Sequence, residues 1–151
     1  MKKNLFNTIG VGVAFSPNLK ANIYEAARLA LIFNCKLVLI HVGEYSEDKE
    51  IQLNLILSPF ADEKLTYEMV FQNGDPVEVI LSTTEKLNVG LVVLGAVQRE
   101  NFLKYYLGSI ARKIARNVKC SVLLLTNPSI EKVPYKHIVV NGLKDPKTKT
   151  T

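Results

Sequence analysis

The chain has 151 residues, of which 48% are hydrophobic and 22% charged, a composition typical of one globular domain with a sizeable core. No apolar run approaches the ~20 residues of a transmembrane helix, so we expect no membrane association. The N-terminal stretch is interrupted by Asn and Gly and lacks a small-residue cleavage site, so we expect no secretory signal peptide. We therefore expect a cytoplasmic protein.

The net charge of +5 falls largely between residues 99 and 119 and on lysines near the C-terminus. Basic residues spread along a helix are typical of a solvated face, so we expect no nucleic-acid binding. Cys35 and Cys120 lack the spacing of metal ligands. Two thiols without a secretory signal indicate a reducing compartment, where both are expected to be small buried residues.

The first half of the chain alternates strand and helix patterns. Residues 9–14 form an apolar, β-rich run, and Ser16 and Pro17 then resemble the N-cap and first position of a helix. Residues 36–42 (KLVLIHV) are a continuous apolar run, as expected of a buried parallel strand. A second helix is expected over residues 47–57.

The second half repeats this alternation. Residues 66–72 are a plausible third strand, after which Asp75 and Glu78 form a capping box around the start of a helix. Residues 89–94 predict a fourth strand. A short helix is expected after the Gly-Ser pair at residues 108 and 109, with Ile110, Ala111, Ile114 and Val118 on its inner face.

A fifth strand is expected over residues 121–125 (SVLLL). Strands that alternate with helices predict an α/β fold with a five-stranded parallel sheet and helices on both faces. In such sheets, ligands bind beyond the carboxyl ends of the strands, where the strand order reverses. Residues 14–16, 42–44 and 95–98 each follow a predicted strand and therefore mark the candidate site.

The C-terminal part begins a new pattern after the domain that we assign to residues 1–127. Residues 128–135 are a polar linker with two prolines, and an apolar run follows. Residues 136–151 then predict the truncated start of a second repeat, because aligning Ile138 with Ile9 places Pro146 on Pro17. The alternative is a C-terminal edge strand with a polar tail.

Residues 5 to 126 resemble the universal stress protein family. The matching segments are FSPN, LVLIHV, NGDPVEVI and, most specifically, LVVLGAVQ followed by LGSIARKIARNVKCSVLLL. The resemblance implies a Rossmann-like five-stranded fold, membership of an ATP-binding or a non-binding branch, and dimers or tandem repeats. It also implies that fifth strands pair between domains, so we expect residues 121–125 to form a homodimer or tandem-domain contact.

The resemblance also assigns a phosphate-binding loop. ATP-binding members have Gly-x-x-Gly, nine residues, and then Gly-Ser or Gly-Thr. Gly95, Gly108 and Ser109 match this pattern with the spacing preserved, whereas Gln98 replaces the second glycine. The start of a helix at Gly108 and Ser109 offers N–H groups to an anion, but a side chain at Gln98 occupies space where close backbone approach is required.

Two further positions of the family's nucleotide site correspond to Ala14 and Val42. Ala14 stands where the family has an acidic residue, so a carboxylate that contacts ribose or an ion is lost. Val42 stands at the adenine-contacting position and offers mainly backbone groups. ATP is therefore a possible but disfavoured cofactor.

Other side chains give no catalytic constellation. His41 ends a strand without a partner acid or nucleophile and is interpreted as a hydrogen-bonded structural residue. Ser16 and Ser109 are interpreted as helix caps. We therefore expect a non-enzymatic stress-response module with a degenerate nucleotide pocket that acts through dimer or tandem-domain contacts. The alternatives are a regulator that binds ATP or another nucleotide through the loop from Gly95 to Ser109 and, less favoured, an enzyme of a related nucleotide-binding α/β family.

Overall fold

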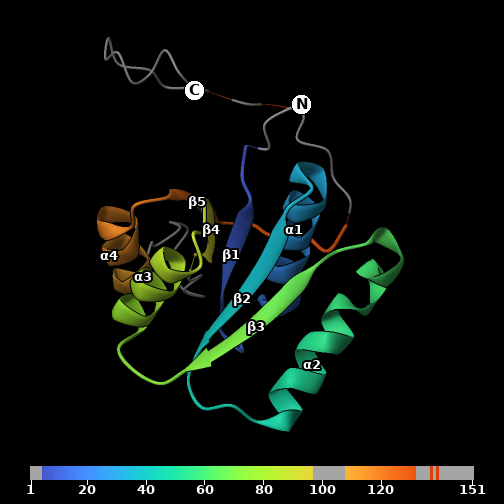
Figure 1. Ribbon diagram of the computed structural model, residues 1–151, viewed down its shortest axis with the longest axis horizontal. Coiled ribbons are helices and arrows are strands. Elements are labelled where there is room, and N and C mark those ends of the chain that lie inside the picture. Colours follow the sequence, from blue (N-terminus) through green and yellow to red (C-terminus); the bar gives the residue numbers. More distant parts are fainter. Residues whose placement is uncertain (1–4, 97–107, 132–136, 138, 140–151) are drawn as a thin grey trace.

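The computed structural model describes residues 5–96, 108–131, 137 and 139 (Figure 1). Within these residues the chain forms one five-stranded sheet in the order β3-β2-β1-β4-β5, with every neighbouring pair parallel. The α/β fold predicted from the sequence is therefore confirmed. The elements are β1 (Thr8–Val13), α1 (Leu19–Phe33), β2 (Lys36–Val42), α2 (Glu47–Leu57), the 3-10 helix η1 (Ser58–Glu63), β3 (Tyr67–Gln72), α3 (Pro76–Lys86), β4 (Leu91–Gly95), α4 (Ser109–Asn117) and β5 (Ser121–Leu125).

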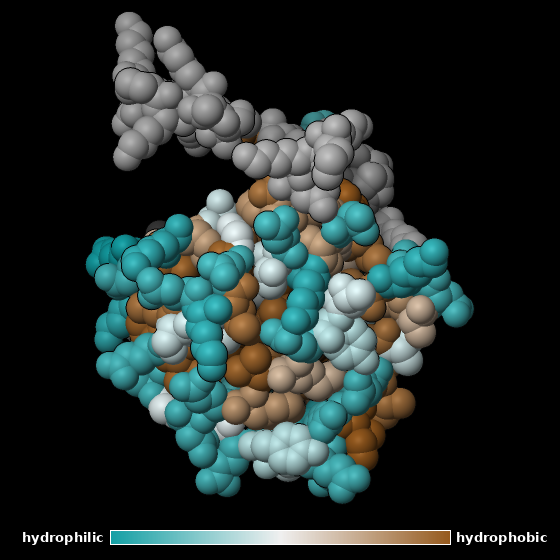
Figure 2. Space-filling view, in the orientation of Figure 1, coloured by the Kyte–Doolittle hydropathy of each residue, from teal (hydrophilic) through white to brown (hydrophobic). Residues whose placement is uncertain are grey.

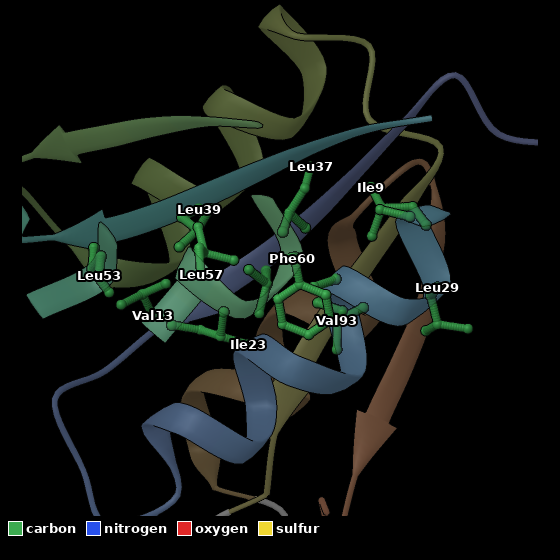
Figure 3. Close-up of a cluster of buried hydrophobic side chains, with 14 of the residues drawn as sticks. Ile9, Val13, Ile23, Leu29, Leu37, Leu39, Leu53, Leu57, Phe60 and Val93 are labelled. Atoms are coloured by element: carbon green, nitrogen blue, oxygen red, sulfur yellow. The ribbon is translucent and has the colours of Figure 1, made fainter. Parts of the chain in front are cut away.

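Two hydrophobic cores lie on opposite faces of the sheet. Helices α1 and α2 cover one face and α3 and α4 cover the other. Successive side chains of a strand point to opposite faces, so β2 and β4 contribute to both cores. The larger core, on the α1 side (Figure 3), contains Ile9, Val11, Val13, Ile23, Leu37, Leu39, Leu53, Leu57, Phe60 and Val93.

Strand β1 is asymmetric across the sheet. Its odd-numbered residues enter the α1-side core, whereas Gly10 and Gly12 face α3 and α4. A Cβ on Gly12 would lie 3.1 Å from Cδ2 of Leu94 and 3.8 Å from Cδ1 of Ile80. The glycines thus let neighbouring side chains pack directly on the β1 backbone, which explains the GVG sequence without a nucleotide.

Several local expectations are corrected by the structure. The N-cap of α1 is Asn18, without a side-chain hydrogen bond, so Ser16 does not cap this helix. Gly108 is the N-cap of α4, and Ser109 is its first helical residue rather than a cap. Ile110 begins the helix 47% exposed, because the inward face of α4 starts only at Ala111.

Helix α2 carries apolar side chains on more than one face. Leu53 and Leu57 are buried against α1 and the sheet, whereas Ile51 and Leu55 are 49% and 67% exposed. Apolar residues accordingly reach the surface around α2, at the lower right of Figure 2. Across the part of the chain that the structure describes, no helix combines the length and hydrophobicity required to span a bilayer.

The two cysteines differ in burial. Cys35 is buried, as expected, but Cys120 is only half-buried at the start of β5. Burial raises the pKa of both thiols. The predicted linker over residues 128–135 falls partly, and the predicted second repeat over residues 136–151 almost entirely, outside the described residues.

The capping of α3 provides a test of the fold's local energetics. Asp75 accepts hydrogen bonds from the backbone N–H groups of Val77 (2.9 Å) and Glu78 (3.1 Å), as its predicted N-cap role requires. We expect Asp75→Ala to lower the free energy of unfolding by about 0.5–2 kcal/mol, because it removes an N-cap acceptor. Urea denaturation measures this change. Asp75→Asn keeps an acceptor oxygen and should cost less; an equal loss in both variants would contradict the capping explanation.

Candidate functional site

The strand order reverses at β1, which has β2 on one side and β4 on the other. Val11 is in register with Val93, so the end of β1 is level with Gly95 at the end of β4. Ala14 directly follows β1. The structure therefore brings Ala14 and Gly95 together at the switch point, which is the place where ligands bind in open α/β sheets.

The N-terminus of α4 faces the same edge of the sheet. Helix α4 connects two parallel strands and so begins at their carboxyl ends. Gly108 accepts a hydrogen bond from Arg112 N–H (3.0 Å), and the first turn contains no acidic residue. The first N–H groups of a helix lack intrahelical acceptors, so Gly108 and Ser109 retain the features of an anion site. Gln98 lies outside the described residues.

Val42 ends β2 on the other side of β1. It is in register with Gln72 of β3, and its side chain packs against the core under α3 and α4. Because that side chain is apolar and already packed, Val42 has only main-chain polar groups to offer a ligand. The structure thus places Ala14, Val42 and Gly95 along one edge, as the sequence predicts.

His41 is held by its neighbours at this edge. Its Nδ1 lies 3.0 Å from the carbonyl oxygen of Val13, and since a carbonyl only accepts, Nδ1 carries the proton. The rings of Phe15 and Phe71 contact the imidazole edge-to-face, with centroids 4.9 and 5.7 Å away. Gly43 follows at φ +151°, where a Cβ would lie 2.9 Å from Nε2 of His41. These contacts support the structural interpretation of His41.

Asn22 is a residue of this site that no sequence motif marks. It lies near the start of α1, and its amide nitrogen would be 2.5 Å from a Cβ added to Gly95. Its Oδ1 is buried without a hydrogen-bond partner. An unpaired buried carbonyl is costly, so this oxygen is available to a hydrogen-bond donor. Packing against Asn22 also explains why residue 95 is a glycine.

A groove of about 470 Å³ lies next to the switch point, between the β1–α1 loop and α2. Its lining is mainly apolar and includes Phe15, Leu19, Leu55 and Ile56. In the described parts of the chain, no three or more His, Cys, Asp or Glu side chains come close enough to form a metal site. Ser16, Lys20 and Gln52 also line the groove, so it offers a hydroxyl, an ammonium and an amide beside its apolar surface.

Comparison with known proteins places this geometry in a family. Residues 43–126, more than half of the chain, match the model of the universal stress protein family. Universal stress protein E of Salmonella typhi is 36% identical over 64 residues, a match that covers 42% of this chain and 19% of the relative. The chain thus aligns with only about a fifth of that protein.

Solved structures share the fold. A universal stress protein in complex with cAMP superposes with a TM-score of 0.65 at 22% identity, covering 80% of this chain and 97% of that one. A universal stress protein from Archaeoglobus fulgidus DSM 4304 gives a TM-score of 0.66 at 21% identity, covering 83% and 45%. With the family model matching over most of the domain and the same fold in these structures, the chain belongs to the universal stress protein family.

Proposed function

We propose that this chain is a non-enzymatic stress-response module whose nucleotide pocket is degenerate and which acts through contacts between domains. The observation that carries the proposal is Ala14 at the switch point. This position lies level with the ends of β4 and β2, yet it offers only a methyl group. A ligand there would meet no carboxylate from β1.

The loss of this carboxylate weighs against ATP. A hydrogen bond to a charged group contributes about 1.5–3 kcal/mol, and about 1.4 kcal/mol corresponds to a tenfold change in affinity. If the side chain of Gln98 opposes the phosphates by a similar amount, a micromolar site becomes millimolar. Gly95 does not offset this argument, because its contact with Asn22 accounts for the glycine without a phosphate.

A nucleotide-binding regulator is the second candidate function. The features that support it are the helix start at Gly108 and Ser109 and the unpaired Oδ1 of Asn22. The structurally similar universal stress protein in complex with cAMP makes a nucleotide the first ligand class to test. If a nucleotide binds, its phosphate would lie at the start of α4, and Asn22 would accept a hydrogen bond from a hydroxyl or amino group.

The non-enzymatic part of the proposal rests on the engagement of the titratable groups at this edge. His41 donates from Nδ1 to Val13 and is enclosed by Phe15 and Phe71. It therefore lacks the open geometry of a general base beside a nucleophile. An enzyme of a related nucleotide-binding α/β family is the least supported of the three hypotheses.

Pairing through β5 is the domain contact that we propose. The N–H of Ser121 donates to Gly90 and the carbonyl of Leu125 accepts from Ala96, the two residues that flank β4. The alternating backbone groups of Val122 and Leu124 therefore point to the outer edge of β5, with which no described strand pairs. An apolar strand with unpaired backbone groups on its edge favours pairing with another strand. The occupant is a second copy of the chain or, if residues 136–151 open a second repeat, the following domain.

We expect the unmodified chain to bind ATP with millimolar affinity. Ala14→Asp combined with Gln98→Gly should tighten binding by two or more orders of magnitude, more than either change alone, because each restores about 1.5–3 kcal/mol. Isothermal titration calorimetry measures both affinities. Ala14→Asn with Gln98→Gly is the control, since it has the shape of Asp without the charge. Micromolar binding by the unmodified chain would favour the nucleotide-binding regulator instead.

We also expect a dimer at tens of micromolar that depends on the free edge of β5. Val122→Pro removes an outward N–H without removing a bond to β4, because proline lacks the donor. Light scattering should give a monomer for Val122→Pro and a dimer for Val122→Ala, which loses packing but keeps the N–H. A monomeric unmodified chain, or a dimeric proline variant, would contradict pairing through β5.

A further inference from the structure

The segment that follows β5, residues 126–131, does not leave the domain as a free linker. It passes from the end of β5 to the outer face of α1 (Figure 1). Pro128 and Ser129 are half-buried there, whereas Ile130 is 52% exposed. We call residues 126–131 the docked segment.

Both backbone polar groups of Ser129 are bound by side chains of α1. Its N–H donates to Oε1 of Glu25 at 3.1 Å, and its carbonyl oxygen accepts from Nη2 of Arg28 at 2.9 Å. The partners are 104 and 101 residues apart along the chain. Hydrogen bonds that involve a charged group are stronger than neutral ones, so Ser129 is held by two strong contacts.

The two side chains that bind Ser129, Glu25 and Arg28, also interact with each other. Arg28 and Glu25 form an ion pair of 3.5 Å, and their side chains are only 14% and 13% exposed. The guanidinium of Arg28 lies 5.9 Å from the ring centroid of Tyr24. By contrast, the Lys119–Glu85 pair is 81% and 66% exposed. Solvent screens exposed pairs and reduces their effect, so the pair on α1 is the better-ordered of the two.

The docked segment also contains a hydrogen bond of its own. The N–H of Glu131 donates to Oγ of Ser129 at 3.0 Å, which forms a local turn at the contact. The contact itself uses only main-chain atoms of Ser129. Recognition therefore depends on the path of the backbone rather than on the serine side chain, a property that allows a sharp comparison of variants.

We infer that Glu25 and Arg28, whose guanidinium lies over the ring of Tyr24, form a docking surface for the docked segment, and that this surface fixes the path of the chain leaving β5. Strand β5 ends with Leu125 at the carboxyl edge of the sheet, but Ser129, four residues later, is bound at the middle of α1. The docked segment is therefore held on the α1 side and does not cross the β5 edge. Docking keeps that edge accessible to a pairing strand.

The partner of this docking surface is a segment of the same chain, residues 126–131. The contact is intramolecular, and it joins the domain to the apolar run that begins at residue 138. A second domain built on that run would start from a fixed point on α1 instead of an unconstrained tether. The inference does not depend on nucleotide binding.

The test is hydrogen exchange of the Ser129 amide in the full chain, measured by NMR. Exchange of this amide should be slowed in the unmodified protein, because its N–H is bonded to Glu25. Glu25→Ala should accelerate it about tenfold or more, since a charged acceptor is lost. The matched control is Glu85→Ala, which breaks the exposed ion pair with Lys119 and should leave Ser129 unchanged. Exchange at the rate of an unstructured peptide in the unmodified protein would overturn the inference.

A second pair of variants covers the case in which Glu25→Ala weakens the whole fold. Ser129→Pro removes the donor, whereas Ser129→Ala keeps both backbone groups. Tryptic cleavage after Lys132, just beyond the docked segment, should be several-fold faster for Ser129→Pro than for Ser129→Ala and the unmodified chain. Hydrogen exchange of the Val11 amide in β1 should stay the same in all three. Equal cleavage rates would show that the segment is not docked.

Discussion

Strand β1 is bonded on both sides and packs against helices on both faces, and the rest of the structure depends on this position. Ile9 and Val11 are fully buried on the α1 side, while glycines on the opposite side admit Leu94 and Ile80. Parallel pairing requires the chain to cross from β3 at one edge to β4 beyond β1. Helices α1 and α4, which follow β1 and β4 in the chain, lie on opposite faces of the sheet, so the switch point lies between these two strands.

The chemistry at the switch point is set by few groups. Ala14 contributes no charge. The side chain of Asn22 fills the space that a Cβ on residue 95 would need, and the start of α4 offers main-chain N–H groups. The edge therefore has the topology at which ligands bind in open α/β sheets, and Ala14 gives it no carboxylate from β1. This combination of the family's fold with an uncharged residue at position 14 is the physical basis of our proposal that the chain acts through contacts between domains.

Two surfaces make such contacts plausible on physical grounds. In the described part of the chain no strand pairs with the outer edge of β5, and the backbone groups of Val122 and Leu124 point toward that edge. The face of α1 binds Ser129 and directs the chain away from that edge. The two features are compatible, because the docked segment, residues 126–131, lies on α1 and does not occupy the position of a strand that pairs with β5.

The sequence by itself determined the order of elements, the buried strand at residues 36–42 and the N-cap Asp75, because these depend on hydrophobic period and on neighbours a few residues away. It also located Ala14 and Gly95 at one edge, since parallel strands share their carboxyl ends. It did not determine that Asn18 rather than Ser16 precedes α1, since both are good N-cap residues. The contacts of Asn22 with Gly95 and of Ser129 with Glu25 were decided only by the tertiary structure, because they join residues far apart in the sequence and no local pattern encodes such a distance.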